Sequence, residues 1–476
     1  MNQTTLPNPA LPLVVDLDGT LSRVDTLHES LVKCFQTAPL GTMGLVFGAR
    51  GKADLKDRLA HLARPDATLL PYRREVLDLV EEHRKAGGVT VLATGAHRAI
   101  AEEVAAHLGC FDQVYATEPG RNLIGQEKAD FLVSRFGRSC FDYVGDSTTD
   151  IPVWRAARRG WVAGGKAKSI AAGSGLELTP LESLSKGRAW KTLRPHQWMK
   201  NALLFLPILS SHQLFQVRLV ESTLFAFLAF STLASLVYVG NDLFDRESDR
   251  KNPSKAKRPI ASGWLSLPGA LLLMLALLVA TGAFASRIPW QAGVALVVYF
   301  VANIVYTVHI KRRLLADVFL LAFMYVWRIV AGSLATGIEL SGWLLGFSVF
   351  LFLSLGFAKR YAEVIRMGAA SGNAAGRAWR PDDAPVLAGA GISTGVAGAI
   401  VLSLYVTGNS FSKLYASPEL VTALSPLFLY WILRIWIQTC RKEMHEDPVL
   451  FAAKDKVSYL VLICAALILA IASIRI

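Results

Sequence analysis

The sequence has few cysteines and no stretch typical of a signal peptide at its start. These absences argue against a disulfide-rich or zinc-knuckle protein and against secretion of the first domain. Its five cysteines form no CxxC pair, so neither a zinc knuckle nor a disulfide framework is expected. Residues 1–10 are polar and lack a basic region followed by an apolar core, and the apolar run at 13–15 is too short for a signal peptide. We therefore expect the first part of the chain to stay in the cytoplasm.

Acidic residues are scarce relative to basic ones, with 37 Asp and Glu against 50 Lys and Arg. The resulting net charge of +13 would fit a nucleic-acid partner, but most of the excess lies in loops between apolar segments. Basic loops are retained on the cytoplasmic side of a membrane, which explains the excess better. We expect a membrane and no nucleic acid as partner.

The two parts of the chain differ in kind. Residues 1 to about 190 mix charged and apolar residues as a soluble domain does, whereas the rest is a series of apolar runs near the roughly 20 residues that cross a bilayer. The expected fold is multi-domain: an α/β domain at 1–180, a linker or interfacial helix at 181–198, and an all-α transmembrane bundle of about nine helices at 199–476. The nine segments are about 199–211, 219–239, 267–286, 290–309, 315–335, 342–358, 386–407, 420–439 and 457–474.

Short apolar runs alternate with amphipathic stretches in the first domain. The pattern predicts strands at 13–15, 89–93 and 141–144 and helices at 73–85 and 99–108. Such alternation indicates a parallel sheet, which binds ligands at the carboxyl ends of its strands. Asp16 and Asp18 directly follow the first strand, where one carboxylate is placed to attack phosphorus and the other to transfer a proton.

Four elements in a fixed order carry a family resemblance. They are Asp16-Leu17-Asp18-Gly19-Thr20, Ala93-Thr94-Gly95, Lys128, and Gly145-Asp146-Ser147-Thr148-Thr149-Asp150. Together they resemble the haloacid dehalogenase (HAD) superfamily of phosphatases over residues 11 to 170. The resemblance implies a Rossmann-like fold with a helical cap inserted at about 21–71.

The resemblance also implies a role for each matching residue. Asp16 would be the nucleophile that becomes aspartyl phosphate, Asp18 the general acid and base, and Thr94 and Lys128 the holders of the transferring phosphoryl group. Phosphoryl transfer needs mainly alignment and charge neutralisation, which these residues can supply. A degenerate domain kept as a scaffold is the alternative. The implied Mg²⁺ ligands are Asp16, the backbone carbonyl of Asp18, Asp146 and Asp150.

A second acidic motif lies at the end of a hydrophobic segment. In a helix, Asp242, Asp245 and Asp249 would fall on one face with Asn241 beside them. Carboxylates at this spacing favour a Mg²⁺ site that substrate phosphates complete. Basic residues at 255–258 follow at once and supply cations for a phosphorylated ligand. A solvated acidic helix end is the alternative.

This motif resembles the first aspartate-rich motif of the UbiA family of intramembrane prenyltransferases, whose bundle is similar in its segment count. Residues 194–201, 306–317 and the Lys359-Arg360 pair with Glu363 are similar to the branch that makes decaprenylphosphoryl-5-phosphoribose. That branch implies transfer of 5-phosphoribose from 5-phosphoribosyl diphosphate to a polyprenyl phosphate, with pyrophosphate leaving.

The resemblance implies a catalytic Mg²⁺ on Asp242, Asp245 and Asp249, so each domain would hold one Mg²⁺. Many relatives carry a second DxxxD pair, but here Leu321 stands four residues after Asp317, so we expect no second metal there. The implied substrate-binding candidates are Lys200, Asn201, Asn241, Lys257, Arg258, Lys311, Asp317, Lys359 and Arg360.

The sequence therefore predicts a bifunctional enzyme of the cytoplasmic (inner) membrane with both sites facing the cytoplasm. The HAD-like domain would remove the 5-phosphate of the lipid product, an expectation that rests on the fusion alone. One alternative is an aromatic prenyltransferase with a polyprenyl diphosphate donor. Another is a membrane-anchored phosphatase with a non-catalytic bundle. Prenyl chain length and homo-oligomeric state are left open.

Overall fold

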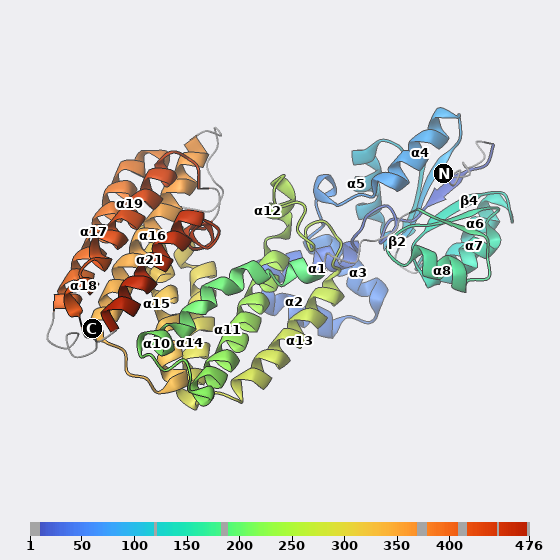
Figure 1. Cartoon of the computed structure of the whole chain (residues 1–476). Helices are drawn as coiled ribbons and strands as arrows, with labels where there is room; N and C mark the ends of the chain where they lie inside the picture. The colour runs from blue at the N-terminus through green and yellow to red at the C-terminus, as the bar shows by residue number, and fades with distance from the viewer. Residues whose placement is uncertain are drawn as a thin grey trace. The chain divides into compact units, whose positions relative to one another are not determined.

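The computed structural model describes residues 10–118, 121–181, 189–368, 378–407, 417–444 and 447–473 (Figure 1). The chain divides into two compact units. The first unit is Met1–Thr192 with Val239–Leu273, and the second unit is Leu193–Tyr238 with Met274–Ile476. The expected linker at 181–198 stays a prediction, because residues 182–188 lie outside the described residues.

A six-stranded parallel sheet forms the centre of the first unit, as the alternating pattern predicted. Its spatial order is β3-β2-β1-β4-β5-β6, so β1 lies in the middle and pairs with β2 and β4. The strands are β1 (Leu13–Val15), β2 (Thr90–His97), β3 (Gln113–Thr117), β4 (Asp142–Gly145), β5 (Gly160–Val162) and β6 (Leu178–Pro180).

Helices cover both faces of this sheet because successive side chains of a strand point to opposite faces. Leu13 and Val15 of β1 pack in one core with α4 and α5, whereas Val14 packs in another core with α6, α7 and α8. The helices are α4 (Arg74–Lys85), α5 (Arg98–Leu108), α6 (Gly125–Phe136), α7 (Ile151–Ala156) and α8 (Ala167–Gly173). The result is the three-layer fold expected of a HAD domain.

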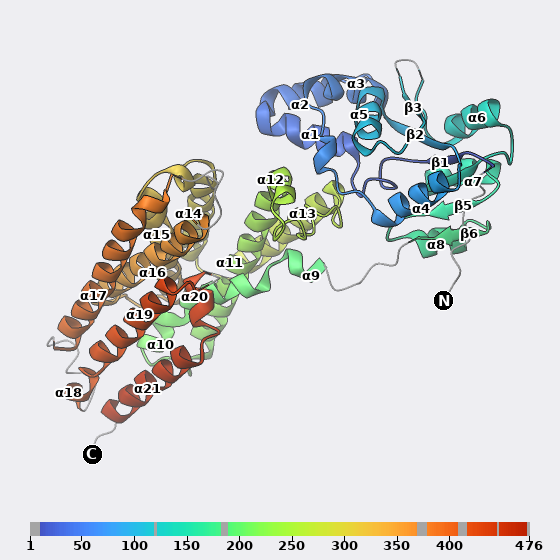
Figure 2. The same ribbon diagram turned by 90° about the horizontal axis from the view of Figure 1, so that it is seen from above.

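The insertion expected at about 21–71 folds into three helices and one short 3₁₀ turn, Ala67–Leu69. The cap helices are α1 (Thr26–Thr37), α2 (Pro39–Gly48) and α3 (Lys52–Leu62), and Figure 2 shows them grouped beside α5. Asp25 begins α1, since its carboxylate accepts hydrogen bonds from the backbone N–H groups of Leu27 and His28.

The first unit also contains residues 239–273, which include the end of α11 (Val217–Phe244), α12 (Arg246–Lys251) and the start of α13 (Leu267–Ala285). The loop after α12 packs closely on the cap. Gly263 has a positive φ of 72°, and a Cβ there would lie 2.7 Å from the Cβ of Arg23 and 3.1 Å from the Cγ of Pro71. Only glycine permits so close an approach in this conformation.

In the second unit, the elements that the structure describes are all helices. It begins with a 3₁₀ helix, Pro195–Phe205, followed by α10 (Leu206–Ser210) and most of α11. Short elements here are the 3₁₀ turns Ile310–Arg312 and Pro381–Asp383, α18 (Pro418–Val421) and α20 (Pro448–Ala452). The short helix α9 (Ala189–Thr192) belongs to the first unit and ends its Met1–Thr192 part. The remaining long helices are α13, α14 (Trp290–Val308), α15 (Ala316–Thr336), α16 (Gly342–Gly368), α17 (Ala384–Thr407), α19 (Leu424–Cys440) and α21 (Lys456–Ser473).

Within the described ranges, eight helices are long and apolar enough to cross a membrane, and with them the chain is an integral membrane protein. The expected segment at about 199–211 is the one that falls short, because it is divided between the 3₁₀ helix and α10. Part of it is nevertheless buried: Leu204 and Ile208 are inaccessible, and the backbone of Leu204 packs against Gly332 of α15.

Candidate active sites

The first candidate site surrounds Asp16, which follows β1 at the carboxyl end of the sheet. The Nζ of Lys128 lies 2.9 Å from Oδ1 of Asp16 and 3.1 Å from the hydroxyl of Tyr143. That hydroxyl donates a hydrogen bond of 2.7 Å to Asp150. The structure thus brings together three of the residues that the sequence singled out, and Tyr143 joins them as an addition.

The carboxylates of Asp16, Asp146 and Asp150 form the part of the site that suits a cation. One oxygen from each lies within 4.8 Å of the others. Gly19 makes this approach possible, because a Cβ at its positive φ of 76° would stand 2.2 Å from Oδ2 of Asp146. Hard oxygen donors at this spacing fit Mg²⁺, so the donor set agrees with the expected metal.

Burial and the charges of neighbouring carboxylates raise the pKa values of Asp16 and Asp146. Burial, followed by the charges of Asp16 and Asp150, raises the pKa of Asp146 to about 8. Burial, followed by the charge of Asp25, raises the pKa of Asp18 to about 7, although the N–H of Thr26 donates to its carboxylate at 2.8 Å. A carboxyl group with such a pKa can act as both acid and base near neutral pH.

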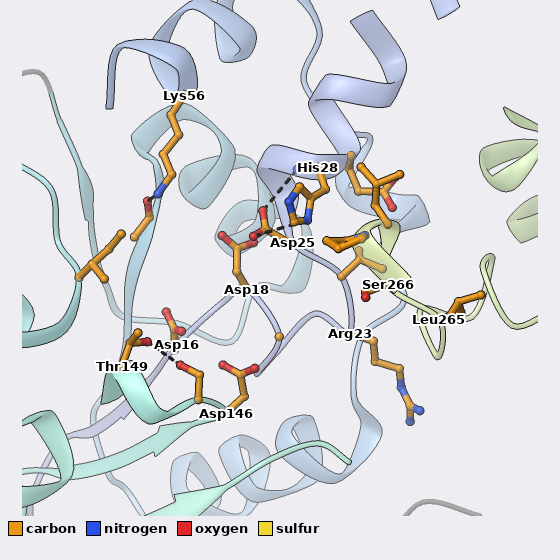
Figure 3. Close-up of a pocket in the computed structure, with 18 of the residues that line it drawn as sticks. Asp16, Asp18, Arg23, Asp25, His28, Lys56, Asp146, Thr149, Leu265 and Ser266 are labelled. Atoms are coloured by element: carbon orange, nitrogen blue, oxygen red, sulfur yellow. Dashed lines mark hydrogen bonds and ion pairs between the residues drawn. The ribbon is translucent and has the colours of Figure 1, made fainter. Parts of the chain in front are cut away.

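Thr94 is fully buried inside β2, where its hydroxyl accepts a hydrogen bond from the N–H of Ala96 at 3.0 Å. Its neighbour Gly95 lines the cavity in front of Asp16. Lys56 of the cap reaches over the cavity and donates to the carbonyl of Gly95 at 2.6 Å. In Figure 3, Lys56 and His28 approach from the cap, and Asp16 and Asp146 from the sheet.

The aspartate-rich motif forms the second candidate site, and here the helix prediction was wrong in one respect. The expected single helix is interrupted, because α11 ends at Phe244 and α12 begins at Arg246, with Asp245 exposed between them. The N–H groups of Asp245 and Asp249 still donate to the carbonyls four residues earlier, at 2.8 Å each. Asp242 and Asp249 are buried and share Nη1 of Arg258 at 3.1 Å and 2.6 Å. Asn241 is half-buried and Lys257 is exposed.

A third group of charges lies in the second unit around Asp447, which the sequence analysis did not single out. The Nζ atoms of Lys200 and Lys359 each lie 2.8 Å from Oδ2 of Asp447, and the hydroxyl of Tyr325 donates to Oδ1 at 3.1 Å. Asp447 also begins α20 by accepting from the N–H of Val449. Two lysines that the sequence predicted for phosphate binding therefore meet at one carboxylate.

Asn201 and Arg328 lie in the same unit. The carbonyl oxygen of Asn201 accepts from Nε of Arg328 at 2.8 Å, and Nη2 of Arg328 donates to the hydroxyl of Tyr299 at 2.8 Å. Arg328 is buried and, among the described residues, forms no ion pair with a carboxylate. An ionised group at such a place is usually functional.

Asp317, at the start of α15, forms a separate cluster. It is fully buried, pairs with Nε of Arg360 at 2.6 Å and accepts from Nε1 of Trp379 at 3.1 Å. Arg360 also pairs with Glu363 at 2.6 Å. Lys311 is half-buried in the 3₁₀ turn that precedes α15. Asp317 therefore already has an ion-pair partner, which it shares with Glu363.

Comparison with known families identifies both parts of the chain. A model of the UbiA prenyltransferase family matches residues 204–452, and a model of haloacid dehalogenase-like hydrolases matches residues 46–155. The chain belongs to the UbiA prenyltransferase family. It also carries a HAD-like hydrolase domain, as the sequence motifs indicated.

The chain is also similar to individual proteins and solved structures. An uncharacterized Sinorhizobium fredii protein, y4nM, is 34% identical over 472 residues, 97% of this chain and 91% of that protein. A decaprenyl-phosphate phosphoribosyltransferase of Mycobacterium tuberculosis is 34% identical over 182 residues, which are 37% of this chain and 59% of that enzyme. The solved structure of a UbiA homolog from Archaeoglobus fulgidus bound to GPP and Mg²⁺ has 17% identity and a TM-score of 0.46, covering 60% of this chain and 100% of that one.

Several residues of this UbiA chain that surround the sites were missed by the sequence analysis. Asp447 had a signal, since it is an acidic residue directly before a proline in a loop between apolar segments. Tyr325 lies inside an apolar segment, where a hydroxyl has no distinctive spacing. The cap residues His28 and Lys56 had no sequence signal either, because their position over Asp16 depends on how the cap packs on the sheet domain.

Proposed function

We propose that the UbiA part transfers 5-phosphoribose from 5-phosphoribosyl diphosphate to a polyprenyl phosphate. A phosphate oxygen of the lipid attacks C1 of the ribose, a new C1–O bond forms, and the bond from C1 to the diphosphate breaks, so pyrophosphate leaves. The observation that carries this proposal is that the buried carboxylates of Asp242 and Asp249 meet at Arg258. The sequence likeness to a decaprenyl-phosphate phosphoribosyltransferase supports the choice of donor and acceptor.

Asp242, Asp245 and Asp249 would hold the Mg²⁺ that this reaction requires. The ion would supply positive charge to the departing diphosphate. Arg258 already lies between two of these carboxylates and can turn to the diphosphate once a cation replaces it. Lys257 is exposed in the same loop and is free to bind phosphate. Lys200 and Lys359 are proposed to bind substrate phosphates in the second unit.

We propose that the HAD-like domain is a phosphomonoesterase. The Asp16 carboxylate attacks phosphorus, the P–O ester bond breaks, and Asp18 gives its proton to the leaving alkoxide. A water molecule then attacks the aspartyl phosphate while Asp18 takes its proton, which releases inorganic phosphate and restores Asp16. Asp16, Asp146 and Asp150 would hold Mg²⁺, which supplies charge neutralisation. The product's 5-phosphate is the proposed target.

Both sites are proposed to face the cytoplasm from the inner membrane, which requires nine crossings. The first crossing would be the 3₁₀ helix with α10. Eleven residues at about 2.0 Å and five at about 1.5 Å span roughly 30 Å, the thickness of a bilayer core. A reporter active only outside the cytoplasm, fused after Ile476, should then be active. Ile476 itself lies outside the described residues, and a silent fusion would contradict nine crossings.

The experiment that tests the reaction uses membranes that contain the protein. They are incubated with radiolabelled 5-phosphoribosyl diphosphate, polyprenyl phosphate and Mg²⁺, and the lipid fraction is analysed by mass spectrometry. We expect a labelled polyprenylphosphoryl-ribose without its 5-phosphate, and the same lipid with the phosphate retained from an Asp16→Asn variant. Prenylation of an aromatic acid instead would support the aromatic prenyltransferase alternative.

A further inference from the structure

The cavity in front of Asp16 is much larger than a phosphate group requires. Its volume is about 550 Å³, within the range of pockets that bind whole small molecules. Two of its sides are those expected of a HAD domain, the strand ends with Asp16 and Asp146 and the cap with His28 and Lys56. Its third side comes from residues 243–268, which belong to the UbiA family match.

This third side is held firmly in the first unit. Glu29 of α1 is buried and accepts from Nε of Arg246 at 2.8 Å and from Nη2 of Arg250 at 2.7 Å. Arg250 also donates to the carbonyl of Ala261 at 2.8 Å, and Gly263 packs against Arg23 without room for a side chain. A buried ion pair with two arginines is costly to break, so these contacts fix residues 246–263 against the cap.

The third side is mostly apolar, unlike the other two. Besides Arg246 and Ser266 it presents Leu243, Ile260, Leu265, Leu267 and Pro268. In Figure 3, Leu265 and Ser266 lie across the cavity from Lys56. A phosphatase for small soluble sugar phosphates has no use for this surface, because hydroxyl groups gain nothing from aliphatic neighbours.

The apolar side of the cavity ends at the start of α13. Leu267 and Pro268 begin α13, whose mean hydropathy of 2.2 makes it a candidate membrane span. The cavity therefore extends from a phosphoryl-transfer site at Asp16 to the first turn of a helix of membrane-spanning character. A molecule with a phosphate at one end and a hydrocarbon chain at the other matches this gradient of polarity.

We infer that residues 243–268 form the specificity wall of the phosphatase site, and that this site takes a lipid-linked phosphomonoester rather than a soluble one. The phosphate binds at Asp16 and Lys128, the polar linking group passes between the cap and Arg246, and the start of the hydrocarbon chain contacts Leu267. The inference rests on the proposed phosphomonoesterase activity of Asp16. It requires no phosphoribosyl transfer by the same chain.

The test compares two phosphomonoesters on the full-length protein in detergent micelles. One is ribose 5-phosphate, and the other is synthetic farnesylphosphoryl-ribose 5-phosphate, which needs no transferase step to be made. We expect kcat/KM for the lipid to exceed that for the sugar phosphate by at least about 50-fold, as about three buried methylene groups would produce. Equal values would overturn the inference.

A pair of variants in α13 separates the wall from a general preference for micelles. Leu267→Ser should lower the ratio of the two constants about tenfold, because it removes part of the apolar contact. Leu272→Ser, at an exposed position that does not line the cavity, should leave the ratio unchanged. Misfolding would lower both constants together and so leave their ratio intact.

Two other outcomes have distinct meanings. If Leu272→Ser lowers the ratio as much as Leu267→Ser does, the preference comes from the micelle and the inference is overturned. If neither substrate is hydrolysed while an Asp16→Asn protein behaves identically, the phosphatase half of the proposed function fails and the inference fails with it. Loss of phosphoribosyl transfer alone would leave the hydrolysis ratio, and hence the inference, intact.

Discussion

The charge clusters of the two units are built in opposite proportions. Around Asp16, one lysine faces three carboxylates, those of Asp16, Asp146 and Asp150. Around Asp447 in the second unit, two lysines share one carboxylate. The first cluster has an excess of carboxylates, which a cation would balance, whereas the second has an excess of lysines, which an anion would balance.

The pKa values follow the same contrast. Burial and neighbouring carboxylates raise the pKa of Asp146 to about 8. Burial would raise the pKa of Asp447 as well, but Lys359 and Lys200 hold it far below its usual range. Burying a charge costs free energy unless a charge of opposite sign lies beside it. The sign of the excess charge in each cluster therefore indicates the sign of the ligand that would stabilise it. The proposed ligands differ accordingly: Mg²⁺ for the cluster around Asp16, and a lipid phosphate for the cluster around Asp447.

The largest expected effect is on the acid-rich cluster. Asp16→Asn should reduce phosphomonoesterase activity by at least about 1,000-fold, because an amide cannot attack phosphorus, and should leave lipid labelling from 5-phosphoribosyl diphosphate unchanged. Hydrolysis and labelling are measured on the same membranes. Asp78→Asn, an exposed carboxylate of α4, serves as the control and should change neither. Equal loss of both activities in Asp16→Asn would contradict separate sites.

The aspartate-rich motif should give the reverse result. Asp242→Asn or Asp245→Asn should reduce phosphoribosyl transfer by at least about 100-fold, because the charge that stabilises the leaving diphosphate is lost, while phosphomonoesterase activity is retained. Asp382→Asn, also an exposed carboxylate, is the control. The exposed position of Asp245 makes its variant informative. Full transfer by Asp245→Asn at ordinary Mg²⁺ would remove it from the proposed ligands.

Asp447→Asn tests whether the base-rich cluster accepts an anion. Removing one partner of a buried ion pair costs about 3 kcal/mol, so the melting temperature should fall by several degrees. Farnesyl phosphate should restore part of this loss, because its phosphate can take the place of the carboxylate between Lys200 and Lys359.

Asp455→Asn is the matched comparison for that variant. Among the described residues, the one cation that pairs with Asp455 is Arg434, at 2.6 Å, and Ser458 also donates to its carboxylate, so removal of the charge leaves one cation instead of two. It should also lower the melting temperature, and farnesyl phosphate should not restore it. Equal rescue of both variants would mean that the lipid stabilises the bundle generally. It would contradict the prediction that the cluster around Asp447 binds an anion.

The outcome of the sequence analysis differs between these regions for a physical reason. Asp16 and Asp146 follow β1 and β4, and parallel strands bring their carboxyl ends to one edge, so these two residues could be placed together in advance. Lys128 lies on α6, and only the family resemblance placed it beside them. The end of α11 before Asp245 could not be predicted, because the acidic residues at 242, 245 and 249 keep the spacing of one continuous helix. Contacts such as Lys200 with Asp447 join residues far apart in the chain, and no periodicity predicts them.

The smallest expected effect concerns pH and distinguishes the two activities once more. Asp18 must be protonated to supply the leaving alkoxide, and burial together with Asp25 raises its pKa to about 7. Below that pH the proton is present, and above it kcat/KM for hydrolysis should fall about tenfold per pH unit as the proton is lost. Phosphoribosyl transfer does not involve Asp18, so it should show no such fall near pH 7. Asp18→Asn should hydrolyse slowly at every pH and lose this limb of the profile. If the limb persists in Asp18→Asn, another group supplies the proton, and the acid-rich cluster does not set the pH dependence.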